Sequence, residues 1–145
     1  MQIYLDSAAL FLLASNDERR NDFLRQLEEW IQSDGKLFTS VIAIEALFLR
    51  MYDLEQAGLV AMSDMRSFLH DSAALWQEIL PLTPADMGRA LELQQIHALR
   101  PAVAMHAAIA LNNGIDRIAS NDTAYRQVTG LKFWPILNNS RGVDP

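Results

Sequence analysis

Short apolar runs alternate along this chain with segments whose apolar residues recur at helical spacing. The first run, residues 3–5, ends at Asp6, and apolar residues then recur at intervals of one to four positions between Ala8 and Leu13. This pattern predicts a buried strand that leads directly into a helix. The alternation continues to the end of the chain, and further strands are predicted at 37–39, 76–80, 115–119 and 131–134.

The segments between these runs predict helices, at 18–33, 41–56, 60–74, 83–99 and 102–112, with a short one after Asp122. Thr83 and Pro84 supply a hydroxyl cap and a proline in the first turn, and Asn113-Gly114 is typical of a left-handed helix end. Strands that alternate with helices imply a mostly parallel sheet of about five strands, covered on both faces. We expect residues 1–137 to form one domain, followed by a turn-rich tail at 138–145.

Length and composition narrow the class of protein. A chain of 145 residues that is 50% hydrophobic and 21% charged is large and apolar enough for one globular domain. It has no cysteine, which excludes disulfides and thiolate metal sites and favours a reducing compartment. We find no signal-peptide pattern and no apolar stretch that would span a bilayer, so we expect a cytoplasmic protein without membrane contact.

The net charge of −6 argues against general electrostatic attraction to nucleic acid. Acidic residues in a cation site would count toward this formal charge, although a bound cation would neutralise them. Asp6 and Asp122 are candidates for such a site, because each follows a predicted strand and parallel strands present their carboxyl ends at one edge of the sheet. Either residue could instead simply cap the helix that follows it, since Asp is a preferred N-cap.

Glu45 is the third candidate acid. No other residue between Val41 and Leu49 is charged, and the helical neighbours of Glu45 are apolar. If it were buried there, a lone carboxylate would be costly unless it were protonated, paired with an arginine or bound to a cation. Together with Asp6 and Asp122 it suggests a Mg²⁺ or Mn²⁺ site, because several like charges in one place need a counter-ion.

The ordered set of motifs resembles the PIN-domain family of VapC-like toxins and metal-dependent ribonucleases. The matching segments are Tyr4-Leu5-Asp6-Ser7, Thr39-Ser40 with the later Glu45, 104–111 and 118–122. The resemblance implies a three-layer α/β/α sandwich and a Mg²⁺- or Mn²⁺-dependent endoribonuclease of RNA. It also implies an antitoxin protein as partner, and a homodimer.

The resemblance also assigns roles to individual residues. It implies that Asp6, Glu45 and Asp122 are metal ligands with a catalytic role. The supporting polar positions that it implies are Ser7, Ser40, Ser120 and Asn121.

One position departs from the family pattern. The family usually carries an Asp three residues before His106, whereas this chain has Val103, preceded by Arg100, Pro101 and Ala102. Valine cannot bind a metal ion, and the loss of even an indirect ligand partner lowers metal affinity or activity by ~10–100-fold. Water could fill the vacant coordination position, since Mg²⁺ retains water readily. We therefore expect weakened nuclease activity; the alternative is a catalytically degenerate module that binds RNA or protein.

Three further interpretations stay open from the sequence. His106 lies in an alanine-rich segment, which is more typical of a packed, hydrogen-bonded histidine than of a general base. Arg100 and Arg126 lie near the expected acidic edge and could contact phosphates or simply cover the surface. A receiver-like signalling domain is disfavoured, because Asp6 is followed by Ser7 and no acid follows the strand at 76–80.

Overall fold

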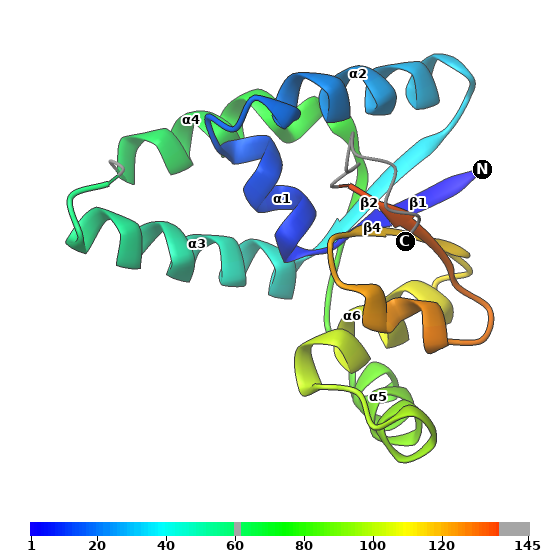
Figure 1. Cartoon of the computed structure of the whole chain (residues 1–145). Coiled ribbons are helices and arrows are strands. Elements are labelled where there is room, and N and C mark those ends of the chain that lie inside the picture. The colour runs from blue at the N-terminus through cyan, green and yellow to red at the C-terminus, as the bar shows by residue number, and fades with distance from the viewer. Residues whose placement is uncertain (60–61, 137–145) are drawn as a thin grey trace.

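The computed structural model describes residues 1–59 and 62–136 (Figure 1). The domain boundary predicted at 137, the tail at 138–145 and the first two residues of the helix predicted at 60–74 lie outside the described residues.

A five-stranded sheet forms the centre of the molecule. Its strands are β1 (Gln2–Leu5), β2 (Lys36–Ser40), β3 (Trp76–Leu80), β4 (Arg117–Ser120) and β5 (Lys132–Pro135). Their order across the sheet is β3-β2-β1-β4-β5, and every pairing is parallel. The chain builds outward from β1 to β3 on one side and then returns to place β4 on the other side of β1. The strand order therefore reverses between β1 and β4, the point where open parallel sheets form their ligand crevices.

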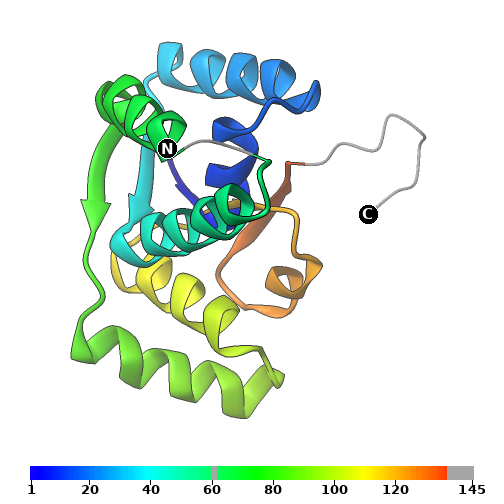
Figure 2. The same ribbon diagram turned by 90° about the vertical axis from the view of Figure 1, so that its left-hand side faces the viewer.

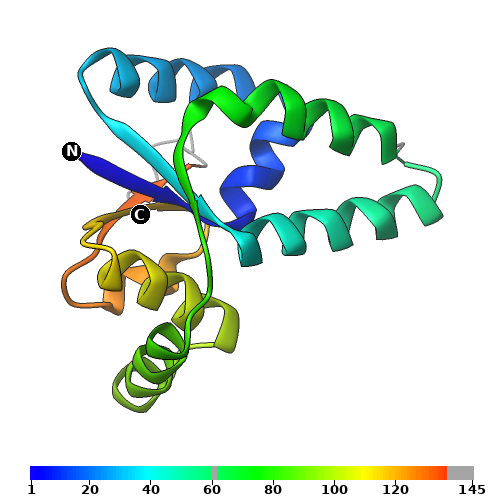
Figure 3. The same ribbon diagram turned by 180° about the vertical axis from the view of Figure 1, so that it is seen from behind.

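Helices cover both faces of the sheet, as the sequence predicts. On one side lie α1 (Ser7–Ala14), α2 (Arg19–Gln32), α3 (Val41–Gln56) and α4 (Met62–Ser72). On the other side lie α5 (Pro84–His97) and α6 (Pro101–Asn112), which pack against each other (Figures 1 and 3). The α/β/α sandwich is thus confirmed. In the part of the chain that the structure describes, no helix has the length and apolarity needed to cross a membrane.

The central strand β1 contributes to both apolar cores. Ile3 and Leu5 pack in the core shared with α1, α2 and α3, whereas Tyr4 points to the opposite face and joins the core beneath α5 and α6. All three side chains are fully buried. Because a parallel strand with helices on both sides has no solvated face, its sequence is a continuous apolar run rather than an alternating one.

Two segments differ from the sequence prediction. The strand predicted at 115–119 begins only at Arg117, because Ile115 is still hydrogen-bonded to the last turn of α6. Gly114 takes a positive φ of 72°, and the Ile115 amide donates to the Ala110 carbonyl at 2.9 Å. The last predicted helix is a short 3-10 helix, η2 (Thr123–Gln127), and another 3-10 turn, η1 (Ala73–Leu75), separates α4 from β3.

The turn between α5 and α6 yields a stability prediction. Ala98 ends α5 in the left-handed conformation, with a φ of 51°. Glycine adopts this conformation without the Cβ clash, so Ala98→Gly should raise the free energy of unfolding by about 0.5–1 kcal/mol, measured by urea denaturation. Ala102→Gly is the matched control, because Ala102 is an exposed residue inside α6. It should lower the free energy of unfolding, and equal destabilisation by both variants would contradict the assignment.

Candidate active site

The carboxyl ends of β1 and β4 bring Asp6 and Asp122 together. Leu5 pairs with Ala119, so Asp6 follows β1 directly beside the end of β4. The buried Ser120 hydroxyl donates to Asp6 Oδ2 at 2.5 Å and accepts a hydrogen bond from the Asp122 amide at 3.0 Å. One hydroxyl group therefore joins the two aspartates across adjacent strands.

Both aspartates also cap helices, as the alternative interpretation of the sequence predicted. Asp6 Oδ1 accepts from the Ala9 amide at the start of α1, and Asp122 Oδ1 accepts from the Ala124 amide at the start of η2, each at 3.0 Å. A carboxylate oxygen has two lone pairs, so one capping bond leaves acceptor capacity for a further ligand. Capping is therefore compatible with binding of an ion by the same side chains.

Asp6 is buried without an opposite charge. Its side chain is 3% exposed, and none of the ion pairs in the described residues includes it. Burial raises the pKa of the Asp6 carboxyl above its ordinary value, while hydrogen bonds from Ser120, Ala9 and Tyr125 oppose that rise. A buried carboxylate of this kind is stabilised either by a proton or by a bound cation.

Asp122 is less buried and does have a cationic partner. The Arg100 guanidinium donates to Asp122 Oδ2, and the two side chains are 75% and 21% exposed. Arg100 therefore lies at the acidic edge, where the sequence allowed a phosphate contact. Arg126 lies over the ring of Phe133, with 5.1 Å between Cζ and the ring centroid.

Glu45 differs from its sequence interpretation. Residues Ala43, Leu47 and Met51 form the buried face of α3, whereas Glu45 is exposed. Three of its four helical neighbours, Val41, Phe48 and Leu49, are 46–53% exposed, and the fourth, Ile42, is half-buried. The condition of burial is therefore not met for Glu45, and its role as a metal ligand stays a prediction. No ion pair or hydrogen bond joins Glu45 to an arginine or to the two aspartates in the described ranges.

Val103 contributes only apolar surface. It is 4% exposed and packs in the core beneath α5 and α6, together with Leu99 and Ala107. Residues 1–59 and 62–136 contain no group of three or more His, Cys, Asp or Glu residues placed to hold a metal ion. A site in which Asp6, Glu45 and Asp122 share one ion therefore stays a prediction.

A buried polar chain lies behind the aspartates, and the sequence did not reveal it. The Tyr4 hydroxyl is 2.6 Å from Ser40 Oγ and 2.6 Å from His106 Nδ1. Ser40 Oγ also accepts from the Ala43 amide at 3.2 Å and so caps α3. This chain of hydrogen bonds ties β1, the end of β2 and α6 together directly under the candidate site.

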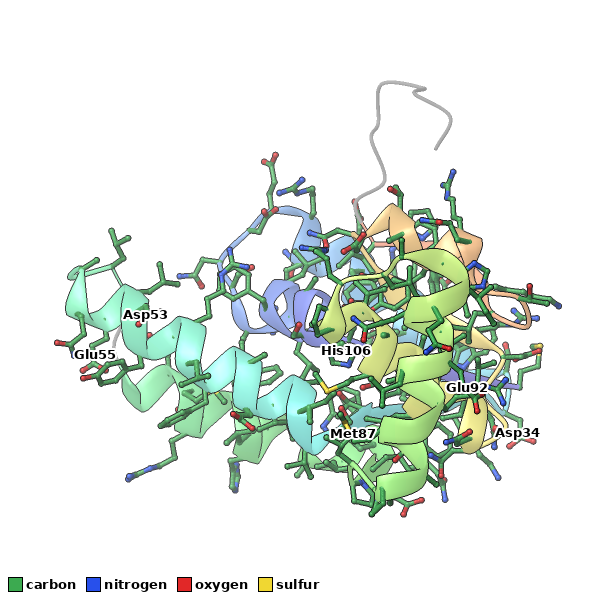
Figure 4. All side chains as sticks on the ribbon, turned by 90° about the horizontal axis from the view of Figure 1, so that it is seen from below. Asp34, Asp53, Glu55, Met87, Glu92 and His106 are labelled. Carbon is green, nitrogen blue, oxygen red and sulfur yellow. The ribbon has the colours of Figure 1, made fainter. Side chains whose placement is uncertain are left out.

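His106 belongs to the interior of the domain. It is 3% exposed, and Figure 4 shows it on α6 within the fold. Burial lowers the pKa of His106 from 6.5 to about 4. The imidazole is therefore neutral at neutral pH and hydrogen-bonded to Tyr4, which confirms the packed histidine that the sequence favoured over a general base.

The remaining predicted polar residues divide into buried and accessible ones. Ser40 and Ser120 are fully buried and orient their neighbours, whereas Ser7 is half-buried at the start of α1. Asn121 is exposed and lines a small cavity of about 190 Å³ together with Phe11 and Arg50. Arg50 stacks on the Phe11 ring, with 3.6 Å between Cζ and the ring centroid.

The chain belongs to the PIN domain family. The family model for the PIN domain matches residues 3–131, which include every element from β1 to η2. PIN domains are generally nucleases. Comparison with curated protein sequences gave no match.

Several solved structures share this fold at low sequence identity. VapBC2 from Rickettsia felis, in complex with a DNA fragment from its promoter, superposes with a TM-score of 0.73 at 14% identity, covering 93% of this chain and 98% of that one. FitAcB from Neisseria gonorrhoeae gives 0.65 at 18% identity, covering 94% and 99%. VapC20 from Mycobacterium tuberculosis, a toxin that cleaves the sarcin-ricin loop, gives 0.63 at 15% identity, covering 86% and 93%.

The donor set at the β1 and β4 ends fits a hard divalent cation. Mg²⁺ is held in many proteins by one or two carboxylates and completes its coordination with water. Asp6 offers a buried carboxylate that lacks an opposite charge, and Asp122, whose backbone amide donates to Ser120, offers a second carboxylate that pairs with Arg100. Two carboxylates are few for such an ion, so we expect weak binding.

The burial of Asp6 predicts the behaviour of Asp6→Asn in metal-free protein. Because the folded pKa of Asp6 is raised, folding takes up a proton, and the stabilisation is lost as pH rises from the unfolded pKa through the folded one. Asparagine carries no charge, has nearly the same shape as aspartate, and keeps one oxygen that can accept from the Ala9 amide. Asp6→Asn should therefore raise the midpoint of thermal unfolding at pH 7 in EDTA. The gain should shrink toward pH 4, and a gain independent of pH would show that the buried charge is not its cause.

The neutral His106 predicts the opposite pH dependence. The unfolded chain takes up a proton below its pKa of 6.5, whereas the folded chain does so only near about 4. The native state should therefore lose about 2 kcal/mol between pH 7.5 and 5 through this one group. His106→Gln should lack this loss, so the wild-type and variant stabilities from urea denaturation should converge as pH falls. Asp6 is present in both proteins, so its contribution cancels in the difference between their free energies of unfolding. If the two free energies change in parallel with pH, His106 does not titrate as described.

Proposed function

We propose that this protein is a Mg²⁺- or Mn²⁺-dependent endoribonuclease with weakened activity, the toxin of a toxin–antitoxin pair. The observation that carries the proposal is the linkage of Asp6 and Asp122 through Ser120, at the point of the PIN-domain sheet where the strand order reverses. The buried Asp6 carboxylate, which has no opposite charge beside it in the described residues, supports a cation there.

In this proposal each residue has a separate role. Asp6 and Asp122 would hold the ion, and Glu45, one turn into α3, would act as a third donor. The bound ion would supply an activated water and offset the charge that develops on the phosphate. Ser120 would keep the two aspartates in register, with Ser7 and Asn121 at the rim. The Tyr4, Ser40 and His106 chain would hold the strand ends and α6 in fixed positions behind them.

A second candidate function is a PIN domain that binds RNA or protein without cleaving. Val103 favours it, because the start of α6 provides a buried apolar side chain where the resemblance leads us to expect an acid. The exposure of Glu45 favours it as well, since only two acids are joined at the site in the described residues. The two candidates share one fold and differ in whether a cation is bound productively.

Partners and location are part of the same proposal. VapBC2, FitAcB and the toxin VapC20 share the fold, which supports an antitoxin partner for this chain. The exposed apolar residues of α3, including Phe48 and Leu49, offer a surface for that partner or for a second copy in a homodimer. We propose that the protein acts on RNA in the cytoplasm, as one domain that extends to residue 137.

Cleavage of single-stranded RNA in Mn²⁺ or Mg²⁺ tests the proposed reaction. The wild-type protein should cleave slowly, and Asp6→Asn should be inactive. Val103→Asp should raise the rate by ~10-fold or more, because the resemblance implies a metal-binding carboxylate at this position and loss of even an indirect ligand partner costs ~10–100-fold. Gel electrophoresis of a labelled RNA over time measures all three rates.

The same experiment separates the two candidate functions. Cleavage by Val103→Asp alone would support the non-catalytic module, in which the scaffold persists without the activity. Absence of cleavage from both the wild-type protein and Val103→Asp, with EDTA and Asp6→Asn as blanks, would contradict the nuclease. Binding of the same RNA in EDTA would then identify an RNA-binding domain.

A further inference from the structure

Arg100 is held in place by the turn that connects α5 and α6. Ala98 ends α5 in the left-handed conformation, and the buried Leu99 anchors the turn in the core. The Gln94 side-chain amide donates to the Leu99 carbonyl at 3.0 Å, and Pro101 restricts the backbone of Arg100 to an extended conformation. The turn therefore presents the Arg100 side chain at the start of α6, although the side chain itself is mostly exposed.

The guanidinium of Arg100 donates to Asp122 Oδ2, the carboxylate oxygen that makes no capping hydrogen bond. Asp122 Oδ1 already accepts from the Ala124 amide, and Oδ2 accepts from Arg100. An ion that bound Asp122 through Oδ2 would meet the positive charge of the guanidinium at the same oxygen, so each cation weakens the binding of the other. The ion pair therefore competes directly with a divalent cation.

A cation site needs negative charge, whereas the start of α6 carries a positive charge and an apolar side chain. Position 103 has an apolar side chain, and one turn earlier the helix presents a cation toward Asp122. We propose that Arg100 is a tethered counter-ion that neutralises Asp122 in the free protein and lowers the affinity of the site for divalent cations. This inference rests on the proposed cation site, and it names the residue that sets the affinity of that site.

Mn²⁺ binding to the whole chain, measured by electron paramagnetic resonance of the free ion, tests this inference. Arg100→Gln should lower the dissociation constant for Mn²⁺ by up to about fivefold, because an exposed ion pair shifts an equilibrium by at most about that factor. Arg100→Lys keeps the charge and should bind Mn²⁺ more nearly as the wild-type protein does. Arg126→Gln removes the same charge from η2, at a side chain that lies over Phe133, and should leave the affinity close to wild type.

The variants also distinguish an electrostatic role from a structural one. The Arg100 side chain caps no helix and is mostly exposed, so Arg100→Gln should fold with unchanged circular dichroism. If Arg100→Gln and Arg126→Gln tighten Mn²⁺ binding equally, the effect is general charge and the inference is wrong. Unchanged or weaker binding by Arg100→Gln, with Mn²⁺ bound by the wild-type protein, would overturn the inference and leave the proposed nuclease intact.

Failure of the proposed function gives a different result. If neither the wild-type protein nor Arg100→Gln binds Mn²⁺, both the inference and the metal-dependent nuclease are wrong. If Arg100→Gln binds Mn²⁺ more tightly and neither protein cleaves RNA, the inference holds and the nuclease does not. Asp122→Asn should abolish the difference between arginine and glutamine at position 100, because the guanidinium then has no carboxylate to neutralise.

Discussion

The burial of one carboxylate at the end of the central strand constrains the rest of the site. Asp6 follows β1, which is enclosed by α1 to α4 on one face and by α5 and α6 on the other, so its side chain is almost completely shielded from bulk water. Transfer of a charge into such a place is costly without hydrogen bonds and an opposite charge. Ser120, Ala9 and Tyr125 supply hydrogen bonds, and no basic side chain in the described residues supplies the charge. The need for a proton or a cation follows from the position of β1.

The charges next to Asp6 determine how much negative charge this edge of the sheet carries. At Asp122 that charge is offset by Arg100, which is fixed by the turn before α6. At position 103 the same helix offers an apolar side chain, which lowers the total negative charge at the edge. A site with fewer acids, one of which is paired with Arg100, carries less negative charge that a metal ion must neutralise. In the proposed site, this ion pair would stabilise Asp122 without a metal ion and would lower the affinity for one.

Much of the fold follows from local patterns in the sequence, and so does part of the candidate site. The run at 3–5 predicts a central strand because such a strand is buried on both faces. The strands are parallel, as β2 and β3 show in Figure 2, and the carboxyl ends of β1 and β4 bring Asp6 and Asp122 to one edge of the sheet. The exposure of Glu45 could not be predicted, because an apolar stripe on a helix does not indicate whether other elements cover that face. In α3 the covered face is the one with Ala43 and Leu47.

Other features depend on contacts between segments that are distant in the sequence. Tyr4 and His106, which share a hydrogen bond, are 102 positions apart, and Arg100 pairs with Asp122. Both contacts form because α6 and the turn before it pack against the ends of β1 and β4. No spacing or motif encodes either contact.

The ionisation of Asp6 itself tests the need for a proton or a cation most directly. Nuclear magnetic resonance of the side-chain carboxyl carbon, followed through a pH titration, reports the pKa of that one group with and without Mg²⁺. In metal-free protein the pKa should lie above the ordinary value for aspartate, and addition of Mg²⁺ should lower it, because the ion favours the charged form. An ordinary pKa that Mg²⁺ leaves unchanged would contradict both the burial of Asp6 and the cation site built on it.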